Sequence, residues 1–180
     1  MFIESFESSV PEEFCVRAVD WARSAPDRAP AEVAPGRRDD ARKLSWDSTL
    51  NSHPELWREY KGYLNLCLID YCRRWPFDRY NKPVEMEWPT MLQQYPPGGG
   101  YLRLHSEAVG PETADRVLAY MTYLTDHDQG GGTEFPLQNL TVQSRRARTV
   151  IWPAGWTHIH RSEPTQDEKI IITGWFRYMR

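Results

Sequence analysis

Residues 148–178, RTVIWPAGWTHIHRSEPTQDEKIIITGWFRY, carry the pattern that decides the predicted fold class of this chain. Short β-rich runs alternate with turns containing proline or glycine, in the order strand, turn, strand, loop, strand. In the last run, which starts at Lys169, apolar residues occupy both odd and even positions, such as Ile171 and Ile172. Because successive side chains of a strand point to opposite faces, we expect this strand to be covered on both sides.

The same pattern of short runs extends back to about residue 87. The runs expected to be strands are 89–95, 100–107, 116–125, 133–135, 140–143, 148–152, 157–161 and 169–178. Eight short strands that follow helices predict a mainly β protein with flanking helices. Its core is expected to be a double-stranded β-helix, the jelly-roll or cupin-like arrangement.

The first half of the chain has a helical period instead. Residues 11–24 form a short amphipathic pattern behind a proline, and apolar residues recur at three- and four-residue steps over 54–74. The intervening segment 25–43 is rich in Pro, Ala, Arg and Asp, which is typical of a surface loop. We therefore expect one domain over 1–180, with a helical N-terminal support region at 1–86 and the β-helix core at 87–180.

Composition excludes several function classes. The 180-residue chain has a net charge of −3 and no basic block, so no nucleic-acid partner is evident. No stretch has the length and apolar character of a secretory signal or a membrane span, so we expect no membrane association. The three cysteines, Cys15, Cys67 and Cys72, have no metal-type spacing and indicate free thiols in a reducing, cytoplasmic compartment. Nothing in the sequence determines the oligomeric state.

Candidate metal ligands follow a glycine-rich turn. In an extended strand, His105 and Glu107 would point to the same side, while Ser106 would point away. A third ligand would come from the downstream segment, where His158 and His160 also share one face, so that alternation alone does not choose between them. Two histidines and one carboxylate form the ligand set of non-haem Fe(II) oxygenases.

Lys169 is a second candidate site residue. It is the only lysine in the C-terminal half of the chain, and it begins a run built otherwise of Ile, Thr, Trp and Phe. A buried ammonium group needs an anionic partner. A co-substrate that carries a carboxylate would supply that anion.

Residues 93–178 resemble the prolyl 4-hydroxylase-like 2-oxoglutarate/Fe(II) dioxygenase superfamily, and most closely its small bacterial and phage members. Five motifs carry the resemblance in the family's order. They are YPPGGGYLRLHSE, RVLAYMTYLTD, GGGTEFP, RTVIWPAGWTHIHRSEP and EKIIITGWF. The resemblance implies Fe(II), 2-oxoglutarate and O2 as cofactor and co-substrates, with ascorbate as a possible reductant.

The resemblance also assigns roles to individual residues. His105, Glu107 and His160 match the family's metal ligands, and the nine-residue step from His160 to Lys169 favours His160 over His158. Lys169 matches the cation that binds the distal carboxylate of 2-oxoglutarate, and the matches to other co-substrate contacts are Tyr95, Tyr123 and Thr173. Glu107 stands where aspartate is commonest, and lysine stands where many relatives have arginine.

The implied reaction hydroxylates a C–H bond of a peptidyl proline or a small amino-acid-like substrate, with release of succinate and CO2. Two other hypotheses remain at this stage: a non-catalytic jelly-roll protein that binds a metal or ligand, and a Zn(II) hydrolase using the same ligands. Substrate contacts are expected on loops, with 25–43, 76–86 and 108–114 as candidates. We expect His53 and His127 at the surface and Trp156 in the core.

Overall fold

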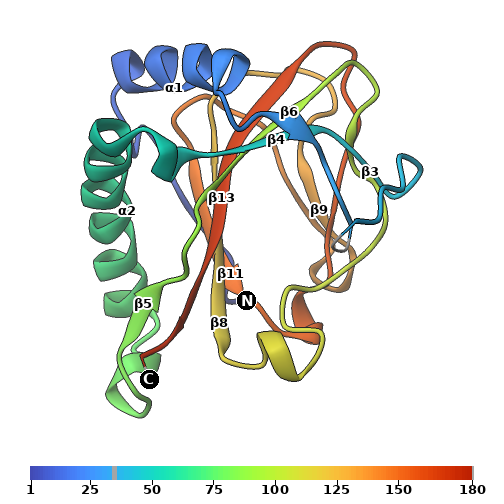
Figure 1. Ribbon diagram of the computed structural model, residues 1–180. Helices are drawn as coiled ribbons and strands as arrows, with labels where there is room; N and C mark the ends of the chain where they lie inside the picture. The colour runs from blue at the N-terminus through green and yellow to red at the C-terminus, as the bar shows by residue number, and fades with distance from the viewer. Residues whose placement is uncertain (34–35, 180) are drawn as a thin grey trace.

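A large antiparallel sheet forms the centre of the computed structural model, which describes residues 1–33 and 36–179. Two helices cover one face of this sheet, and smaller sheets lie on the other side (Figure 1). The large sheet has the order β1-β11-β8-β13-β6-β4-β2, and β5 also pairs with β13. Its strands are β1 (Glu4–Phe6), β2 (Ala29–Pro30), β4 (Trp46–Thr49), β5 (Val84–Met86), β6 (Met91–Tyr95), β8 (Arg116–Tyr123), β11 (Thr149–Pro153) and β13 (Lys169–Tyr178). The smaller sheets contain β3 (Lys43–Leu44) with β7 (Gly100–Tyr101), and β10 (Leu140–Val142) with β9 (Thr133–Phe135) and β12 (Arg161–Ser162).

Both predicted helices are confirmed. Helix α1 (Glu12–Ser24) follows Pro11 and has two glutamates in its first turn, where they interact favourably with the helix dipole. Helix α2 (Pro54–Arg74) begins with a proline, and the His53 ring accepts a hydrogen bond from a backbone N–H of its first turn. No helix among the described residues combines the length and apolar character required to cross a bilayer.

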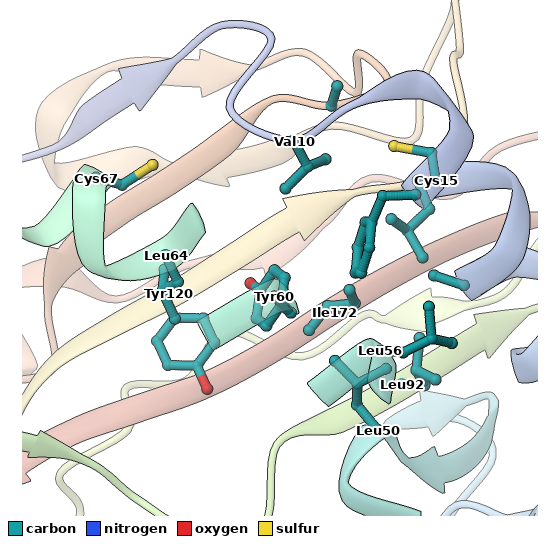
Figure 2. Close-up of a cluster of buried hydrophobic side chains, with 14 of the residues drawn as sticks. Val10, Cys15, Leu50, Leu56, Tyr60, Leu64, Cys67, Leu92, Tyr120 and Ile172 are labelled. Carbon is teal, nitrogen blue, oxygen red and sulfur yellow. The ribbon is translucent and has the colours of Figure 1, made fainter. Parts of the chain in front are cut away.

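Strand β13 is buried on both faces, as the sequence predicted. Ile172 packs with side chains of α2 such as Tyr60 and Leu64 in the cluster between the helices and the sheet (Figure 2). Ile171 points to the other side and belongs to a second cluster with Phe135. Each fully buried apolar side chain of this size contributes about 1.5–3 kcal/mol relative to an exposed one. The predicted mainly β architecture with helices on one outer face is confirmed.

Two predicted strands are wrong in detail. Strand β7 ends at Tyr101, so 100–107 is not one strand, and the run 157–161 begins with a 3-10 turn at Trp156–His158. A turn of three residues cannot be distinguished from a strand by alternation over so short a run. Trp156 is 76% exposed on this turn and does not lie in the core.

The N-terminal part of the chain contains more than helices. Residues 1–86, expected to be a helical support region, also contain five of the strands, and β1, β2, β4 and β5 join the large sheet. The segment 25–43 contains β2 and the first residue of β3, with residues 34–35 outside the described part. Strand β3 pairs with β7, so this segment lies beside the glycine-rich turn.

Candidate functional site

Two chain segments that are far apart in sequence bring three possible metal ligands together. His105 and His160 form an isolated antiparallel bridge, in which each backbone N–H donates to the other's carbonyl at 3.0 and 2.9 Å. The backbone N–H of Glu107 donates to the carbonyl of Ala154 at 3.0 Å. One ligand atom from each of His105, Glu107 and His160 lies within 4.8 Å of the others. The main chain therefore holds the three side chains at one place even though 100–107 is not a continuous strand.

Hydrogen bonds to backbone carbonyls set the tautomers of both histidines. His105 Nδ1 lies 2.9 Å from the carbonyl of Arg103, and His160 Nδ1 lies 2.9 Å from the carbonyl of His158. Since a carbonyl can only accept, each Nδ1 carries a proton, and each ring turns its Nε2 toward the carboxylate of Glu107. These two Nε2 atoms lie 3.6 and 3.2 Å from Oε1 of Glu107.

The charge states agree with a cation at this point. Burial and the neighbouring His160 lower the pKa of His105 to about 4, so its ring is neutral near pH 7. Burial alone would raise the pKa of Glu107, but the two histidines and Trp175 together lower it to about 2. An ionised carboxylate oxygen with two imidazole nitrogens at 3.2 and 3.6 Å forms a donor set that can bind a positive ion. The set fits the two-histidine, one-carboxylate ligand group of non-haem Fe(II).

His158 lies outside this group. Its Nδ1 hydrogen-bonds with the hydroxyl of Thr157 at 2.9 Å, within the 3-10 turn. The turn interrupts the expected strand, and the cavity around the ligand group is lined by His160 and not by His158. The ring of His160 contacts Trp152 edge-on, with centroids 5.0 Å apart.

The ligand group opens into a cavity of about 340 Å3. Its walls contain six of the seven predicted site residues: His105, Glu107, His160, Tyr95, Thr173 and Lys169. The exception is Tyr123, which is fully buried behind the wall, where its hydroxyl hydrogen-bonds with Thr133 at 2.7 Å. Thr133 itself lines the cavity, so Tyr123 supports the wall and does not border the space.

Only 1% of the Lys169 surface is exposed, and no carboxylate within 4.0 Å pairs with its ammonium group among residues 1–33 and 36–179; Glu163 acts on it from farther away and raises its pKa less than burial lowers it. Its ammonium group donates to the carbonyl of Gly131 at 3.1 Å and to the hydroxyl of Ser162. Burial lowers the pKa of Lys169 to about 7. Gly131 has φ +68°, and a Cβ there would lie 3.0 Å from the ring of His127, so the GGG turn requires glycine at this position. His127 is buried beside this turn and is not at the surface as expected.

The hydroxyl groups of the remaining two predicted co-substrate contacts, Tyr95 and Thr173, each donate one hydrogen bond within the protein. Tyr95 donates to Oε1 of Gln93 at 2.5 Å, and its ring lies 4.8 Å from the ammonium of Lys169. Thr173 donates to the carbonyl of Tyr120 at 2.9 Å. Each hydroxyl oxygen retains a lone pair that can accept a hydrogen bond.

Several wall residues were not assigned from the sequence. Tyr101 stacks on the His105 ring with centroids 3.7 Å apart. Arg42 and Lys43 reach the cavity from the 25–43 segment, and Val109 reaches it from the 108–114 loop, while 76–86 contributes no described wall residue. Tyr101 lies four residues before His105, so the expected strand 100–107 would have placed both side chains on the same face. The sequence named the loops 25–43 and 108–114 as candidates but did not single out Arg42, Lys43 or Val109 within them.

A model of the 2OG-Fe(II) oxygenase superfamily matches residues 90–177. No curated protein matches the chain in sequence.

Three solved structures share the fold at 15–17% identity. A collagen prolyl hydroxylase of Paramecium bursaria Chlorella virus-1, solved with 2-oxoglutarate, has a TM-score of 0.75 and 15% identity, covering 100% of this chain and 97% of its own. A Pseudomonas putida prolyl-4-hydroxylase has a TM-score of 0.74 and 17% identity, with coverages of 99% and 93%. A Trichoplax adhaerens prolyl hydroxylase, in complex with a hypoxia inducible factor peptide fragment, has a TM-score of 0.76 and 15% identity, with coverages of 98% and 83%.

Proposed function

Because this chain belongs to the 2OG-Fe(II) oxygenase superfamily and is a 2-oxoglutarate-dependent dioxygenase, we propose that it hydroxylates a prolyl residue of a peptide. The similar solved structures support this choice of substrate, since all three are prolyl hydroxylases and one of them holds a peptide. The match of residues 90–177 to an oxygenase superfamily favours this function over a non-catalytic jelly-roll protein and over a Zn(II) hydrolase.

In this proposal His105, Glu107 and His160 hold Fe(II). Their donor atoms converge within 4.8 Å, both Nδ1 atoms are occupied by backbone carbonyls, and the carboxylate is ionised because its pKa is lowered to about 2. When bound, Fe(II) and 2-oxoglutarate use O2 to insert one oxygen atom into a substrate C–H bond, with release of succinate and CO2. The three side chains occupy only part of an octahedral shell and leave positions open.

The observation that carries the proposal is the buried, unpaired Lys169 in the same cavity as the ligand group. An ammonium with a lowered pKa and no carboxylate beside it is a binding site for an anion of matching size. In the proposal it neutralises the distal carboxylate of 2-oxoglutarate. Tyr95 and Thr173 would donate their hydroxyl protons to the same carboxylate in place of Gln93 and the carbonyl of Tyr120, while Tyr123 holds Thr133 in the wall.

Anaerobic titration with Fe(II) and 2-oxoglutarate tests the site directly. We expect a visible charge-transfer band that requires both components, followed by succinate formation when air is admitted. Proline-containing peptides and free amino acids, added in parallel with and without ascorbate, then test the substrate class by the mass gain of one oxygen atom. Hydroxylation of free amino acids alone would replace the peptide assignment with a small amino-acid-like substrate.

A further inference from the structure

The two oxygens of the Glu107 carboxylate have different surroundings. Oε1 faces the histidines, at 3.2 Å from His160 Nε2 and 3.6 Å from His105 Nε2. Oε2 instead accepts a hydrogen bond from the indole Nε1 of Trp175 at 2.7 Å. An indole N–H is only a donor, so this contact is directional and occupies Oε2 alone.

Trp175 is itself held in place from its other side. The guanidinium carbon of Arg116 lies 3.6 Å from the centre of the indole ring. Two nitrogens of Arg116 bind the two carboxylate oxygens of Glu87 at 2.7 and 2.8 Å, and a third contact at 3.3 Å reaches the carbonyl of Glu107. The Arg116 and Glu87 side chains are only 16% and 20% exposed. A planar guanidinium that is paired bidentately and stacked on a ring has little freedom to rotate.

Three adjacent parts of the large sheet build this arrangement. Trp175 lies on β13, Arg116 begins the neighbouring strand β8, and Glu87 directly follows β5 on the opposite side of β13 (Figure 1). The backbone N–H of Glu87 donates to the carbonyl of Trp175 at 2.8 Å. The three side chains are therefore carried on, or directly beside, paired strands of the sheet, whereas Glu107 lies on the irregular segment after β7.

We propose that Trp175 and Arg116 are positioning residues that restrict Glu107 to binding a metal through Oε1 only. This inference rests on the proposed metal site. A carboxylate can bind a metal through one oxygen or through both. The hydrogen bond from Trp175 occupies the second oxygen, and the Arg116–Glu87 pair keeps the indole in place. One further coordination position then stays open for the co-substrate or for oxygen. A glutamate requires this restraint because it has three rotatable side-chain bonds.

Metal affinity, measured without turnover, tests the proposal. We expect Trp175→Phe to weaken anaerobic Fe(II) or Mn(II) binding by about 10- to 100-fold, the range for loss of a contact that orients a ligand. Arg116→Lys keeps the charge but loses the bidentate pair, and should weaken binding in the same direction. The matched controls are Trp21→Phe, whose indole N–H has no partner, and Arg17→Lys, whose bidentate pair with Glu59 is at the surface. Both controls should bind metal like the wild type.

A double-mutant cycle separates positioning from a general structural effect. In a Glu107→Asp background the shorter carboxylate cannot reach the indole and the metal together, so Trp175→Phe should change the metal affinity by less than about threefold. An equal loss in both backgrounds, or unchanged affinity in Trp175→Phe and Arg116→Lys, overturns the proposal. If the wild type binds no metal, the proposed function fails and the inference fails with it. A wild type that binds metal beside unaffected variants refutes the inference alone.

Discussion

At the scale of single residues, the buried ammonium of Lys169 destabilises the ligand-free fold and favours binding of an anion. Its ammonium is buried with only a carbonyl and a hydroxyl as partners, and burial lowers its pKa to about 7. In the ligand-free protein, burial of the charged ammonium lowers the free energy of unfolding below pH 7. Above pH 7 the buried amine is largely deprotonated. A carboxylate of a ligand removes that cost, which makes this residue the most direct test of co-substrate binding.

We expect Lys169→Met to weaken 2-oxoglutarate binding by about 2–5 kcal/mol, the range for removing one partner of a buried charge pair. The measurement is calorimetric titration of the metal-loaded protein. Lys61→Met, on the exposed side of α2, is the matched control and should bind normally. An unchanged dissociation constant in Lys169→Met would rule out the contact.

Co-substrate binding should also depend on pH. The pKa of Lys169 is lowered from 10.5 to about 7, so above pH 7 the free protein has lost a proton that the unfolded chain and the complex both retain. The stability of the free protein should consequently rise with pH between about 7 and 10, while the affinity for 2-oxoglutarate falls by up to about tenfold per pH unit. Calorimetry at pH 8 in buffers of different ionisation enthalpy should show uptake of about one proton. Zero uptake in the wild type, as expected for Lys169→Met, would contradict this.

The two downstream histidines should differ in effect. His160→Ala should abolish metal binding because it removes a nitrogen 3.2 Å from Glu107 Oε1. His158→Ala should keep the metal affinity within about tenfold, since its ring hydrogen-bonds with Thr157 and only its backbone carbonyl supports His160. Metal content after anaerobic dialysis measures both variants. The assignment is reversed if His158→Ala alone loses the metal.

At the scale of elements, β13 contributes side chains to the hydrophobic core on one face and to the candidate site on the other. Its even positions pack against the helices, and its odd positions carry Lys169, Thr173 and Trp175 into the cavity. Gly174 lies on the helix side, where the Tyr120 ring occupies the space that a side chain would need. A change at this position therefore acts on the cavity residues through the strand.

We expect Gly174→Ala to destabilise the protein by about 1–3 kcal/mol, the usual cost of overpacking. An added Cβ would lie 2.3 Å from the Tyr120 hydroxyl, which is itself hydrogen-bonded to Thr90. Gly62→Ala is a control of opposite sign, because a Cβ on this exposed position of α2 meets nothing within 4 Å. It should stabilise the helix by roughly 0.5–1 kcal/mol. Urea unfolding of both variants gives the two differences.

At the scale of the whole molecule, ligands should stabilise the fold because the site joins segments that separate on unfolding. Binding at a concentration 100-fold above the dissociation constant adds about 2.7 kcal/mol, or roughly 5–10 °C in Tm for a chain of this size. We expect metal alone and metal with 2-oxoglutarate to give successive increases in Tm. In Lys169→Met the metal increment should persist and the 2-oxoglutarate increment should disappear. Loss of both increments would indicate a folding defect instead.

Local sequence determined much of this protein. The two helices and the burial of β13 on both faces could be predicted, because periodicity acts between residues that are near one another along the chain. The residue types drew attention to His105, Glu107 and Lys169, whereas the roles of His160 and Lys169 were implied by the family resemblance. The choice between His158 and His160 could not be made by alternation, since it depends on a 3-10 turn at Trp156–His158.

Tertiary structure alone decided how the site is completed. The Trp175 hydrogen bond to Glu107 joins residues 68 positions apart, and the Gly131 carbonyl that meets Lys169 is 38 positions away. Arg42 and Lys43 reach the cavity only because β3 pairs with β7. The absence of a carboxylate beside Lys169 within the described residues is likewise a property of the packed fold. Such contacts depend on which strands become neighbours, and that follows from packing of the whole sheet and not from any local pattern.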